Sequence, residues 1–350
     1  MLGPRLDVKG GVSSVTRLII DAPTESTEIF FLPSMNDKSL FGRLSHFISR
    51  IVKFPYEWYR IGPDVVHIHF SHSLSTWRKI LLSRIWRLSG ARIVLHAHSS
   101  DYKEYFPKLP GILRWFVTNS IRKSDLLVVL SESWKDFYVN ELGINHERVE
   151  VLPNPIKLPL ISQNKSDQPI SVLFSGRIGE RKGTFDLLLA WSRISPSIRS
   201  RAKLTITGDG EISKARKLVE DLSISDSVNV LGWIPLEELE SLFSTSSIYV
   251  LTSRNEGLPM GLLEAMSHSS AVITSPVGGI PELIDDGING ILVKPGDIES
   301  ITDSLEKLIS NDEARKIMSS NARKSVEPLD IENYNNRIEQ LWRNHSNPNQ

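Results

Sequence analysis

Residues 248–266 read IYVLTSRNEGLPMGLLEAM, a short apolar run followed by a loop with Gly and Pro and then by a helical pattern. The β-branched run predicts a buried strand that ends near Ser253. Pro259 suits the first turn of a helix, because its missing N–H group needs no partner there. In an open α/β sheet, such a junction lies at the carboxyl edge, where helix N-termini offer free N–H groups to a ligand. The segment therefore predicts a parallel sheet with a ligand site after this strand.

The same alternation of β-branched runs and helical patterns continues along the chain, which is typical of βαβ units. Strands are expected at 27–34, 64–70, 91–98, 125–131 and 148–154, and then at 170–177, 202–208, 227–233, 247–253, 270–277 and 290–295. A chain of 350 residues is expected to build two cores rather than one. The predicted fold class is α/β, with two doubly wound Rossmann-like domains that face each other across a cleft.

The domain boundaries follow from composition. We expect an N-terminal domain at 1–155, a linker rich in Pro and polar residues at 156–169, a C-terminal domain at 170–325 and a last helix at 326–350 that packs back on the N-terminal domain. Gly10 and Gly11 lead into a helix near Val12, yet only Met1 and Leu2 stand where a buried first strand is expected. Either that strand is very short or the native start lies upstream of Met1.

Composition limits the class of protein. The chain has no Cys, and neither a membrane-spanning apolar run nor a signal peptide is read from it, so a cytoplasmic protein is expected. The net charge of zero hides an asymmetry, because residues 38–123 hold 15 Lys and Arg against 4 Asp and Glu. This excess suggests that the first half meets an anionic surface or ligand, unless the charges are scattered over solvated faces by chance.

Two glutamates mark the expected ligand site of the second half. Glu264 is expected inside the helix, where its carboxylate can chelate two vicinal hydroxyls of a ribose, and Glu256 on the loop can reach the hydroxyls of another ring. The N–H groups at the start of the helix can meet an anion or sugar hydroxyls. The remaining expected binding residues of this loop are Gly257, Leu258, Pro259 and Met260. The alternative is that Glu264 is a solvated helix residue and that Glu256 only compensates the dipole of the helix. For an isolated glutamate this alternative would be preferred, but the surrounding Gly and Pro favour the binding interpretation.

A second site element is FSGRIGERKGTFDLL at 174–188. Arg177 and Lys182 project from a loop after a strand and can pair with a diphosphate. The segment is not a P-loop, and TGDGEIS at 207–213 lacks the third glycine of a dinucleotide fingerprint, so ATPase and nicotinamide chemistry are disfavoured. After the strand at 227–233, the backbone of Trp233 and Ile234 can hydrogen-bond the edge of a nucleobase.

These motifs together resemble those of the retaining family-4 glycosyltransferases, which have the GT-B fold, and the resemblance covers nearly the whole chain. EGLPMGLLE matches the family's E-x7-E motif, SGRIGERKG its Gly-Arg…Lys-Gly diphosphate motif, and KGGVSSV its Gly-Gly loop. The resemblance implies that Arg177 and Lys182 neutralise the donor diphosphate and that Glu264 binds the ribose. It further implies that Glu256 and the amides after it hold the donor sugar, and that Gly11, beside Gly10, approaches the diphosphate.

Five histidines of the first half, at 67, 69, 72, 96 and 98, cluster near two expected strand ends. Zinc is not expected, because neither Cys nor a well-spaced carboxylate accompanies them. The family carries a cleft histidine after the strand at 91–98, and His98 is the best match, as a contact to the donor sugar near the reaction centre. His96 takes this place if the register is shifted by two residues. Asp101 and Tyr102 are expected acceptor contacts.

The reaction implied by the resemblance moves a sugar from a nucleoside diphosphate donor, with UDP favoured and GDP possible, to a hydroxyl of a glycan or lipid-linked glycan, with retention. No Asp-x-Asp motif occurs, so no metal and no cofactor are expected. Bacterial surface polysaccharide assembly is the implied setting. Alternatives are a nucleotide-sugar epimerase, a phosphorylase on the same fold, and a non-catalytic partner subunit that binds a nucleotide sugar.

The basic first half suggests a membrane surface. Residues 43–60 place Leu44, Phe47, Ile48 and Ile51 on one helix face among basic residues, and residues 75–90 add four basic residues and two tryptophans. Basic amphipathic helices with aromatic residues suit an anionic membrane, so peripheral association with the inner face of the cytoplasmic membrane is expected. The alternative is that these apolar faces pack on the sheet. Nucleic acid is not expected as a partner, because no recognised binding motif accompanies the charge.

Overall fold

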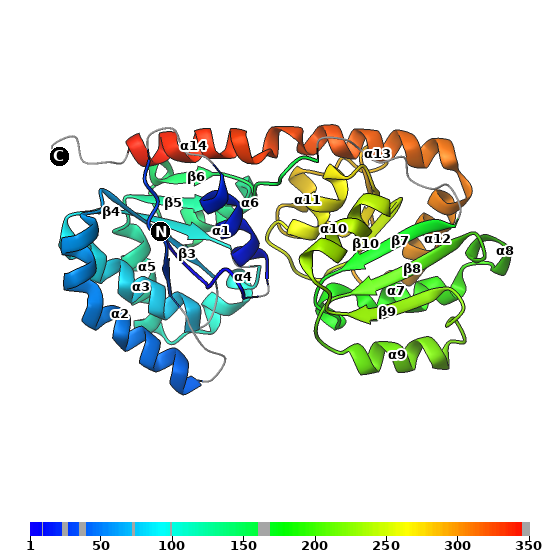
Figure 1. Cartoon of the computed structure of the whole chain (residues 1–350), viewed down its shortest axis with the longest axis horizontal. Coiled ribbons are helices and arrows are strands. Elements are labelled where there is room, and N and C mark those ends of the chain that lie inside the picture. Colours follow the sequence, from blue (N-terminus) through cyan, green and yellow to red (C-terminus); the bar gives the residue numbers. More distant parts are fainter. Residues whose placement is uncertain are drawn as a thin grey trace. The chain divides into compact units, whose positions relative to one another are not determined.

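The computed structural model describes residues 1–8, 10–22, 27–34, 40–71, 74–98, 100–159 and 169–344. The chain forms two compact units, drawn in Figure 1. Unit 1 comprises Met1–Pro155 and Ile331–Gln350, and unit 2 comprises Ile156–Asp330. Each unit is built on a six-stranded sheet whose neighbouring strands run parallel, and helices pack on these sheets. The predicted α/β class with two doubly wound sheets is confirmed.

The sheet of unit 1 has the strand order β2-β1-β3-β4-β5-β6. Its strands are β1 (Leu2–Gly3), β2 (Leu32–Pro33), β3 (Val65–Phe70), β4 (Arg92–Ala97), β5 (Leu126–Val129) and β6 (Val149–Val151). The strand expected at 27–34 is reduced to two residues. The reason is that β2 is an edge strand and pairs only along the two residues of β1, Leu2 with Leu32 and Gly3 with Pro33.

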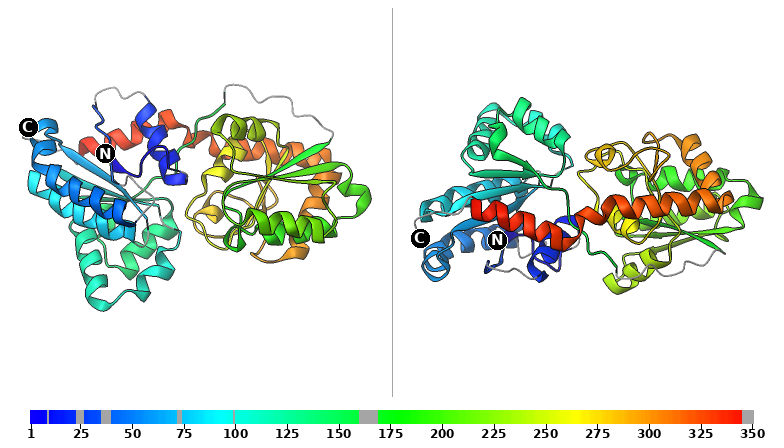
Figure 2. Two further views of the ribbon diagram at one scale, coloured as in Figure 1. Left: turned by 60° about the horizontal axis from the view of Figure 1, so that its bottom comes forward. Right: turned by 90° about the horizontal axis from the view of Figure 1, so that it is seen from above.

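The α-helices described in unit 1 accompany this sheet: α1 (Gly11–Asp21), α2 (Leu40–Ile61), α3 (Leu74–Trp86), α4 (Tyr102–Tyr105), α5 (Gly111–Arg122), α6 (Glu132–Asp136) and α14 (Ile331–Asn344). Helix α3 packs against β3 and contacts both α2 and α5, so it lies between these two helices, as the views in Figure 2 also show. The core beneath them consists of buried strand residues such as Ile68, Phe70 and Leu95, with Trp86 from α3.

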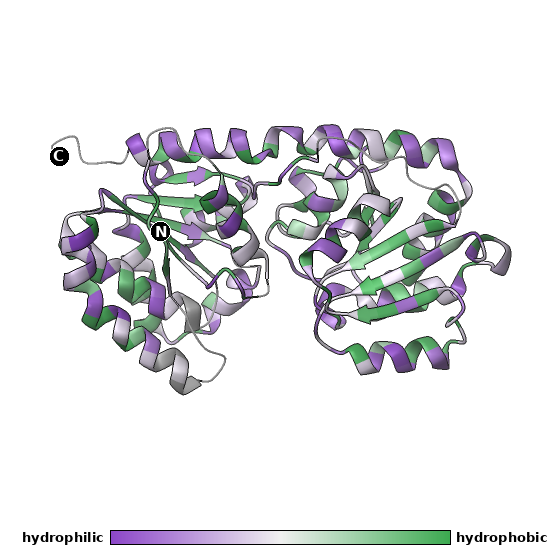
Figure 3. Ribbon diagram, in the orientation of Figure 1, coloured by the Kyte–Doolittle hydropathy of each residue, from purple (hydrophilic) through white to green (hydrophobic). Residues whose placement is uncertain are grey.

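Helix α14 closes unit 1 although it comes from the far end of the chain. Tyr334, Ile338, Leu341 and Trp342 are buried and recur at helical spacing, while the intervening residues are mostly hydrophilic (Figure 3). The helix begins at Ile331 rather than at the expected 326, because Asp312–Val326 form a separate helix, α13, which belongs to unit 2.

The sheet of unit 2 has the order β12-β11-β10-β7-β8-β9. Its strands are β7 (Ile170–Ser175), β8 (Ala202–Thr207), β9 (Val228–Gly232), β10 (Ile248–Leu251), β11 (Ala271–Thr274) and β12 (Ile291–Leu292). Its helices are α7 (Thr184–Arg193), α8 (Pro196–Arg199), α9 (Ile212–Asp221), α10 (Leu236–Thr245), α11 (Met260–Ser267), α12 (Ile298–Ser310) and α13. Every strand expected from the sequence is present in this unit, with shorter ends.

The expected linker is in part a piece of unit 2. Ile156 forms an isolated parallel bridge with Asp330, and the N–H group of Leu158 donates to the Asp330 carboxylate at 3.0 Å. Residues 160–168 of this segment lie outside the described residues. Among the helices that are described, none is both long enough and apolar enough to cross a membrane.

We expect the Leu341→Ala variant to lower the free energy of unfolding of unit 1 by about 2–5 kcal/mol, because this side chain is 3% exposed and its loss leaves a cavity under α14. Urea denaturation followed by tryptophan fluorescence measures this change, since six of the eight tryptophans lie in unit 1. Gln340→Ala, at the exposed neighbouring position, should change it by no more than about 0.5 kcal/mol. Equal losses in both variants would show that α14 is not held by its buried face.

Candidate functional site

The strand order of unit 2 locates a binding crevice. From β7 the chain proceeds outward through β8 to β9, and it then returns to β10 on the other side of β7 and proceeds through β11 to β12. Strands β7 and β10 are therefore neighbours at the point where the order reverses, with Val172 paired to Ile248. In open parallel sheets, ligands bind beyond the carboxyl ends of the strands at this switch point. The two loops that follow β7 and β10 carry the motifs predicted from the sequence.

These two loops are joined by an ion pair. The Lys182 ammonium lies 2.5 Å from Oε1 of Glu256, and the Ser253 hydroxyl donates to the same oxygen at 2.6 Å. Glu256 is buried, and the Lys182 side chain is 15% exposed. A buried carboxylate needs both a counter-charge and hydrogen bonds, and Glu256 has them here. Ser253, which the sequence interpretation missed, is the last residue before the loop turns, and its place at the strand end was the only signal for it.

Further contacts hold the backbones of the same loops together. The Arg254 N–H group donates to the Arg181 carbonyl at 2.8 Å, and the Arg181 guanidinium donates to the Asn255 carbonyl at 3.0 Å. Gly183 has a φ of 72°, and a Cβ atom there would lie 2.3 Å from the Thr252 carbonyl oxygen. Only glycine therefore fits this crossing of the two loops.

Arg177 is exposed, and within the described ranges it makes no ion pair or hydrogen bond. It follows β7 by two residues, on the same loop as Lys182. The two cations of the predicted diphosphate motif therefore have different surroundings. Lys182 is paired with Glu256, whereas Arg177 is exposed to solvent.

Helix α11 begins at this edge of the sheet. Pro259 is its N-cap, with φ −74° and ψ 126°, and so it precedes the helix instead of occupying its first turn as predicted. The first-turn N–H groups of Met260 and Gly261 have no partner in the part of the chain that the structure describes. Gly261 packs against the Tyr249 hydroxyl, which donates to the Ser175 carbonyl at 3.0 Å. The helix thus starts close above β7 and β10, with two donors free for an anion or hydroxyl.

Glu264 is the fifth residue of α11, one turn after Met260 and on the same side of the helix. It is half-buried. Burial, with a smaller contribution from the charge of Glu240, raises the pKa of the Glu264 carboxyl from 4.5 to about 7. This carboxyl therefore changes its charge near neutral pH.

The predicted nucleobase residues lie at the same edge. Gly232 ends β9 with a φ of 82°, and its carbonyl accepts from the Thr207 hydroxyl at 2.7 Å and from the Gly208 N–H group at 2.8 Å. Trp233 follows and is 53% exposed, and Ile234 is half-buried. The structure thus brings Arg177, Lys182, Trp233, Glu256 and Glu264 to the carboxyl edge of one sheet.

In unit 1, the Gly-Gly loop precedes α1. Gly10 caps this helix with a φ of 135°, and Gly11 is its first residue; both are exposed. A Cβ atom on Gly10 would meet nothing within 4 Å, so the backbone conformation and not the packing requires glycine here.

Four histidines of unit 1 form a network in the interior of the unit. The sequence predicted that they cluster near two strand ends, but not the contacts between their rings. His67 and His69 lie on β3, His96 on β4 and His98 immediately after β4. His67 Nε2 lies 3.2 Å from His96 Nδ1, and His69 Nδ1 lies 2.8 Å from His98 Nε2. Burial lowers the pKa of all four rings, that of His96 to about 3, so they are neutral at physiological pH.

Trp342 of α14 sets the proton positions in half of this network. Its indole N–H group donates to His67 Nδ1 at 2.9 Å. Because an indole can only donate, His67 carries its proton on Nε2 and donates to His96 Nδ1. His67, His69 and His96 offer ring nitrogens within 4.8 Å of one another, as a metal site would, but a protonated His67 Nε2 is no metal ligand. The geometry favours a hydrogen-bonded network over a metal centre.

Two predicted residues belong to the core. His96 is fully buried inside the network, so it is not the alternative to the half-buried His98. Tyr102, expected as an acceptor contact, is also fully buried and packs against Phe70 and Phe106. His67 and His69 of β3 cover His96, and Phe106, four residues further along the chain, covers part of Tyr102. Asp101 is half-buried, precedes the short helix α4 and accepts from the Ser100 hydroxyl at 3.1 Å.

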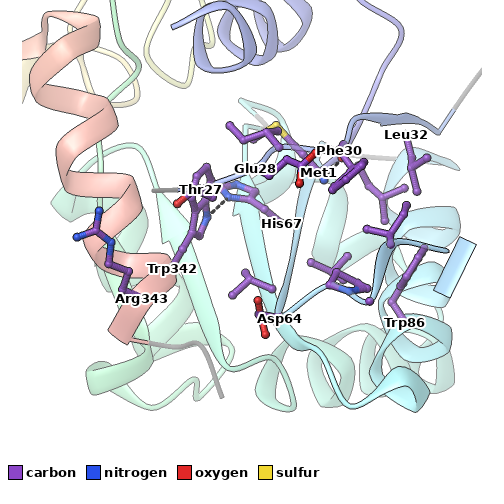
Figure 4. A pocket seen from close by; sticks show the side chains of 17 residues that line it. Met1, Thr27, Glu28, Phe30, Leu32, Asp64, His67, Trp86, Trp342 and Arg343 are labelled. Atoms are coloured by element: carbon purple, nitrogen blue, oxygen red, sulfur yellow. Dashed lines mark hydrogen bonds between the residues drawn. The ribbon is translucent and has the colours of Figure 1, made fainter. Parts of the chain in front are cut away.

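A cavity of about 450 Å³ in unit 1 lies at the opposite edge of the sheet (Figure 4). Its lining includes Met1, Asp64 and Val65, at the amino ends of β1 and β3, together with Trp342 and His67. Ligands of open α/β sheets bind at the carboxyl ends, so this cavity is not the expected site.

The exposed apolar face of helix α2 is not the one that the sequence predicted. Phe47 and Ile51 of α2 are partly buried and pack against the core, in agreement with the alternative that these apolar faces pack on the sheet. In α3, Trp77 is half-buried and Trp86 is buried. The side chain of Leu44 lies outside the described residues. A second apolar stripe of α2 is exposed instead, at helical spacing: Ile48, Val52, Tyr56 and Tyr59, which we call the α2 stripe. Arg50, expected among the basic residues of this helix, pairs with buried Glu57 at 2.9 Å, whereas Lys53 and Arg60 are exposed.

Two α/β units, with the predicted diphosphate loop at the switch point of one sheet, form the architecture found in the GT-B glycosyltransferases. Residues 160–325 match the model of Glycosyl transferases group 1, and residues 22–159 match that of Glycosyltransferase Family 4. The chain belongs to glycosyltransferase family 4.

Individual proteins show the similarity in sequence and in fold. The chain is 25% identical over 332 residues to the Escherichia coli UDP-Gal:alpha-D-GlcNAc-diphosphoundecaprenol alpha-1,3-galactosyltransferase, covering 88% of this chain and 81% of that one. Sucrose-phosphate synthase from Thermosynechococcus elongatus has a similar fold, with a TM-score of 0.77, 18% identity and coverage of 96% and 93%. Anabaena HepE in complex with UDP gives a TM-score of 0.70, 16% identity and coverage of 90% and 86%.

Proposed function

We propose that the protein transfers a sugar from a UDP-sugar to a hydroxyl of a glycan or lipid-linked glycan, with retention, in bacterial surface polysaccharide assembly. The observation that carries the proposal is the Lys182–Glu256 pair, which fixes two motif loops beside free helix N–H groups at the switch point. The E. coli relative uses a UDP-sugar and a diphosphoundecaprenol-linked acceptor by its name, and HepE was crystallised with UDP. The E. coli relative supports a uridine donor and a lipid-linked acceptor here, and HepE supports the uridine donor.

In this proposal the diphosphate is held by cations and dipoles. Arg177 and Lys182, with the first-turn N–H groups of α11, neutralise the charge that the diphosphate gains as the glycosidic bond breaks. This stabilisation acts without a metal ion. Once Lys182 turns to the diphosphate, Glu256 becomes available for hydroxyls of the donor sugar.

The remaining residues of the site position the substrates. Glu264 chelates the ribose hydroxyls, and the backbone of Trp233 and Ile234 meets the base. In unit 1, Gly10 and Gly11 allow the diphosphate to approach the backbone, and His98 contacts the donor sugar. Neutral His98 contributes hydrogen bonds and not charge, since burial lowers its pKa well below the ordinary value.

Thermal stability against UDP, GDP, ADP and CDP tests the donor site. We expect UDP at 100 times its dissociation constant to stabilise the protein by about 2.7 kcal/mol. Arg177→Ala and Glu264→Ala should abolish the shift. Lys217→Ala, at an exposed position of α9, is the matched control and should keep it. Stabilisation by another nucleotide instead of UDP would identify a different base for the donor. If none of the four nucleotides raised the thermal stability, the proposed donor site would be contradicted.

The ionisation of Glu264 predicts a pH dependence of nucleotide binding. A carboxylate accepts two ribose hydroxyls, whereas the protonated form loses acceptor capacity. With a pKa of about 7, the ionised fraction falls roughly tenfold between pH 8 and pH 6, so the dissociation constant of UDP should rise by about that factor. Isothermal titration calorimetry at both pH values measures it. The Glu264→Gln variant is the control, because it shows how much the dissociation constant changes through the ionisation of UDP itself. An equal change of this constant in the variant and the wild type would contradict the role of Glu264.

We further propose that unit 1 binds the inner face of the cytoplasmic membrane through the outer surface of α2, α3 and α5. Of the sixteen large apolar side chains that are exposed in the described part of the chain, ten lie between residues 48 and 115, including the α2 stripe and Trp115. Lys53, Arg60, Arg87 and Arg114 are exposed in the same region. Apolar contact with lipid and attraction to anionic headgroups then act together, at about 1 kcal/mol per basic residue near the surface.

Co-sedimentation with vesicles tests this surface. Vesicles that contain phosphatidylglycerol should retain the protein, and phosphatidylcholine vesicles or high salt should release it. A Val52→Asp/Tyr59→Asp variant should bind at least about tenfold more weakly, since each change places a charge in the apolar stripe. Ile317→Asp alters an exposed apolar residue of unit 2 and should bind as wild type. Equal binding of all three proteins would contradict the proposed surface.

A further inference from the structure

Lys79 is a buried cation of unit 1 that the mechanism above does not use. It lies in the second turn of α3 and is only 5% exposed. Within the described ranges, its ammonium makes no ion pair and no hydrogen bond. Burying a charge without a partner costs stability, so such a lysine is paired, becomes neutral or is held for a ligand.

The position of Lys79 directs its ammonium to the functional edge of the sheet. Side chains on a helix lean towards its N-terminus, and α3 begins after β3, at the carboxyl edge. Thr76, one turn earlier, is fully buried and its hydroxyl donates to the Ser71 carbonyl, which directly follows β3. Lys79 is close enough to His69 and His98 for its charge to lower the pKa of both rings. The ammonium therefore shares the edge on which His98 lies.

Among the described residues, no acidic side chain pairs with Lys79. Four acidic residues occur between 38 and 123. Glu57 pairs with Arg50 at 2.9 Å, and Asp64 lies at the amino end of β3. Neither Asp101 nor Glu104 forms an ion pair with Lys79 within the described residues. Burial, followed by repulsion from Arg78, lowers the pKa of Lys79 to about 7. An anion that enters the site would restore the full charge and gain a strong, desolvated partner.

We propose that Lys79 anchors an anion subsite in unit 1 that takes a phosphate or diphosphate group of a substrate. A lysine ammonium is a compact point charge of the kind that binds phosphate. His69 lies within reach of its charge, and the buried Nε2 atom of His69 also lacks a partner within the described residues, so a second polar group is available nearby. Which substrate carries the phosphate, donor or acceptor, rests on the proposed function.

Inorganic pyrophosphate is the probe, used with the full chain in thermal unfolding. Arg177→Ala removes the exposed cation of the unit 2 site, and we expect pyrophosphate to stabilise this variant still. Adding Lys79→Met should abolish the remaining shift, whereas adding Lys53→Met, an exposed lysine of α2, should not. Equal stabilisation of the Arg177→Ala protein with and without Lys79→Met would overturn the proposal.

Methionine matches the length of lysine and removes an unpaired buried charge, so Lys79→Met should be at least as stable as wild type without ligand. Lys79→Gln serves as a second variant if the first does not fold. An independent measurement uses the wild type: the Lys79 ammonium, followed by NMR, should show a pKa at least one unit higher with pyrophosphate. An unchanged pKa would also overturn the proposal.

The UDP titration separates the two sources of phosphate. If the acceptor carries it, Lys79→Met leaves UDP binding unchanged and raises the KM of the acceptor at least tenfold. If the donor carries it, UDP binding weakens at least tenfold. A failure of the proposed function would be seen differently, as the absence of any nucleotide shift in the wild type, and would leave the pyrophosphate result standing.

Discussion

The ion pair between Lys182 and Glu256 is the interaction on which the site of unit 2 depends. It joins two loops that are 74 residues apart in sequence, at the point where the strand order reverses. Breaking a buried pair by removing one partner leaves an uncompensated charge, at a cost of about 3–5 kcal/mol. The pair therefore fixes Lys182, Glu256 and the start of α11 before a ligand arrives. Because both partners are also proposed donor contacts, the energy of the pair is exchanged for contacts with the donor and not lost.

The sequence predicted the features that depend on local chain geometry. The positions of Arg177, Lys182, Glu256 and Glu264 at a carboxyl edge follow from strand ends and from Gly and Pro, which are visible within ten residues of each. All eleven strands expected from β-branched runs are present, each shorter than expected, and β2 and β12 are reduced to two residues. The residue at which a strand ends depends on the length of the neighbouring strand that it pairs with. That strand lies elsewhere in the chain, so the local sequence does not predict the end.

Features that depend on what covers a residue could not be predicted. Trp342 contacts His67 across 275 positions of sequence, and no pattern near either residue announces this contact. Tyr102 is buried by aromatic residues from the following helices, so its loop position was misleading. Helix α2 carries two apolar faces, and its sequence does not say which of them, that of Phe47 or that of Val52, packs on the sheet. Tertiary packing decides such cases.

The two units use opposite electrostatic strategies at their carboxyl edges. Unit 2 pairs a buried carboxylate with a lysine and leaves Arg177 open to solvent. Unit 1 keeps four histidines neutral by burial, with the proton positions of one pair set by an indole that can only donate. Against this neutral background the buried ammonium of Lys79 is the proposed partner of an incoming anion. A charge held in surroundings of low polarity interacts more strongly than the same charge in water, so a buried lysine attracts an anion more strongly than an exposed one.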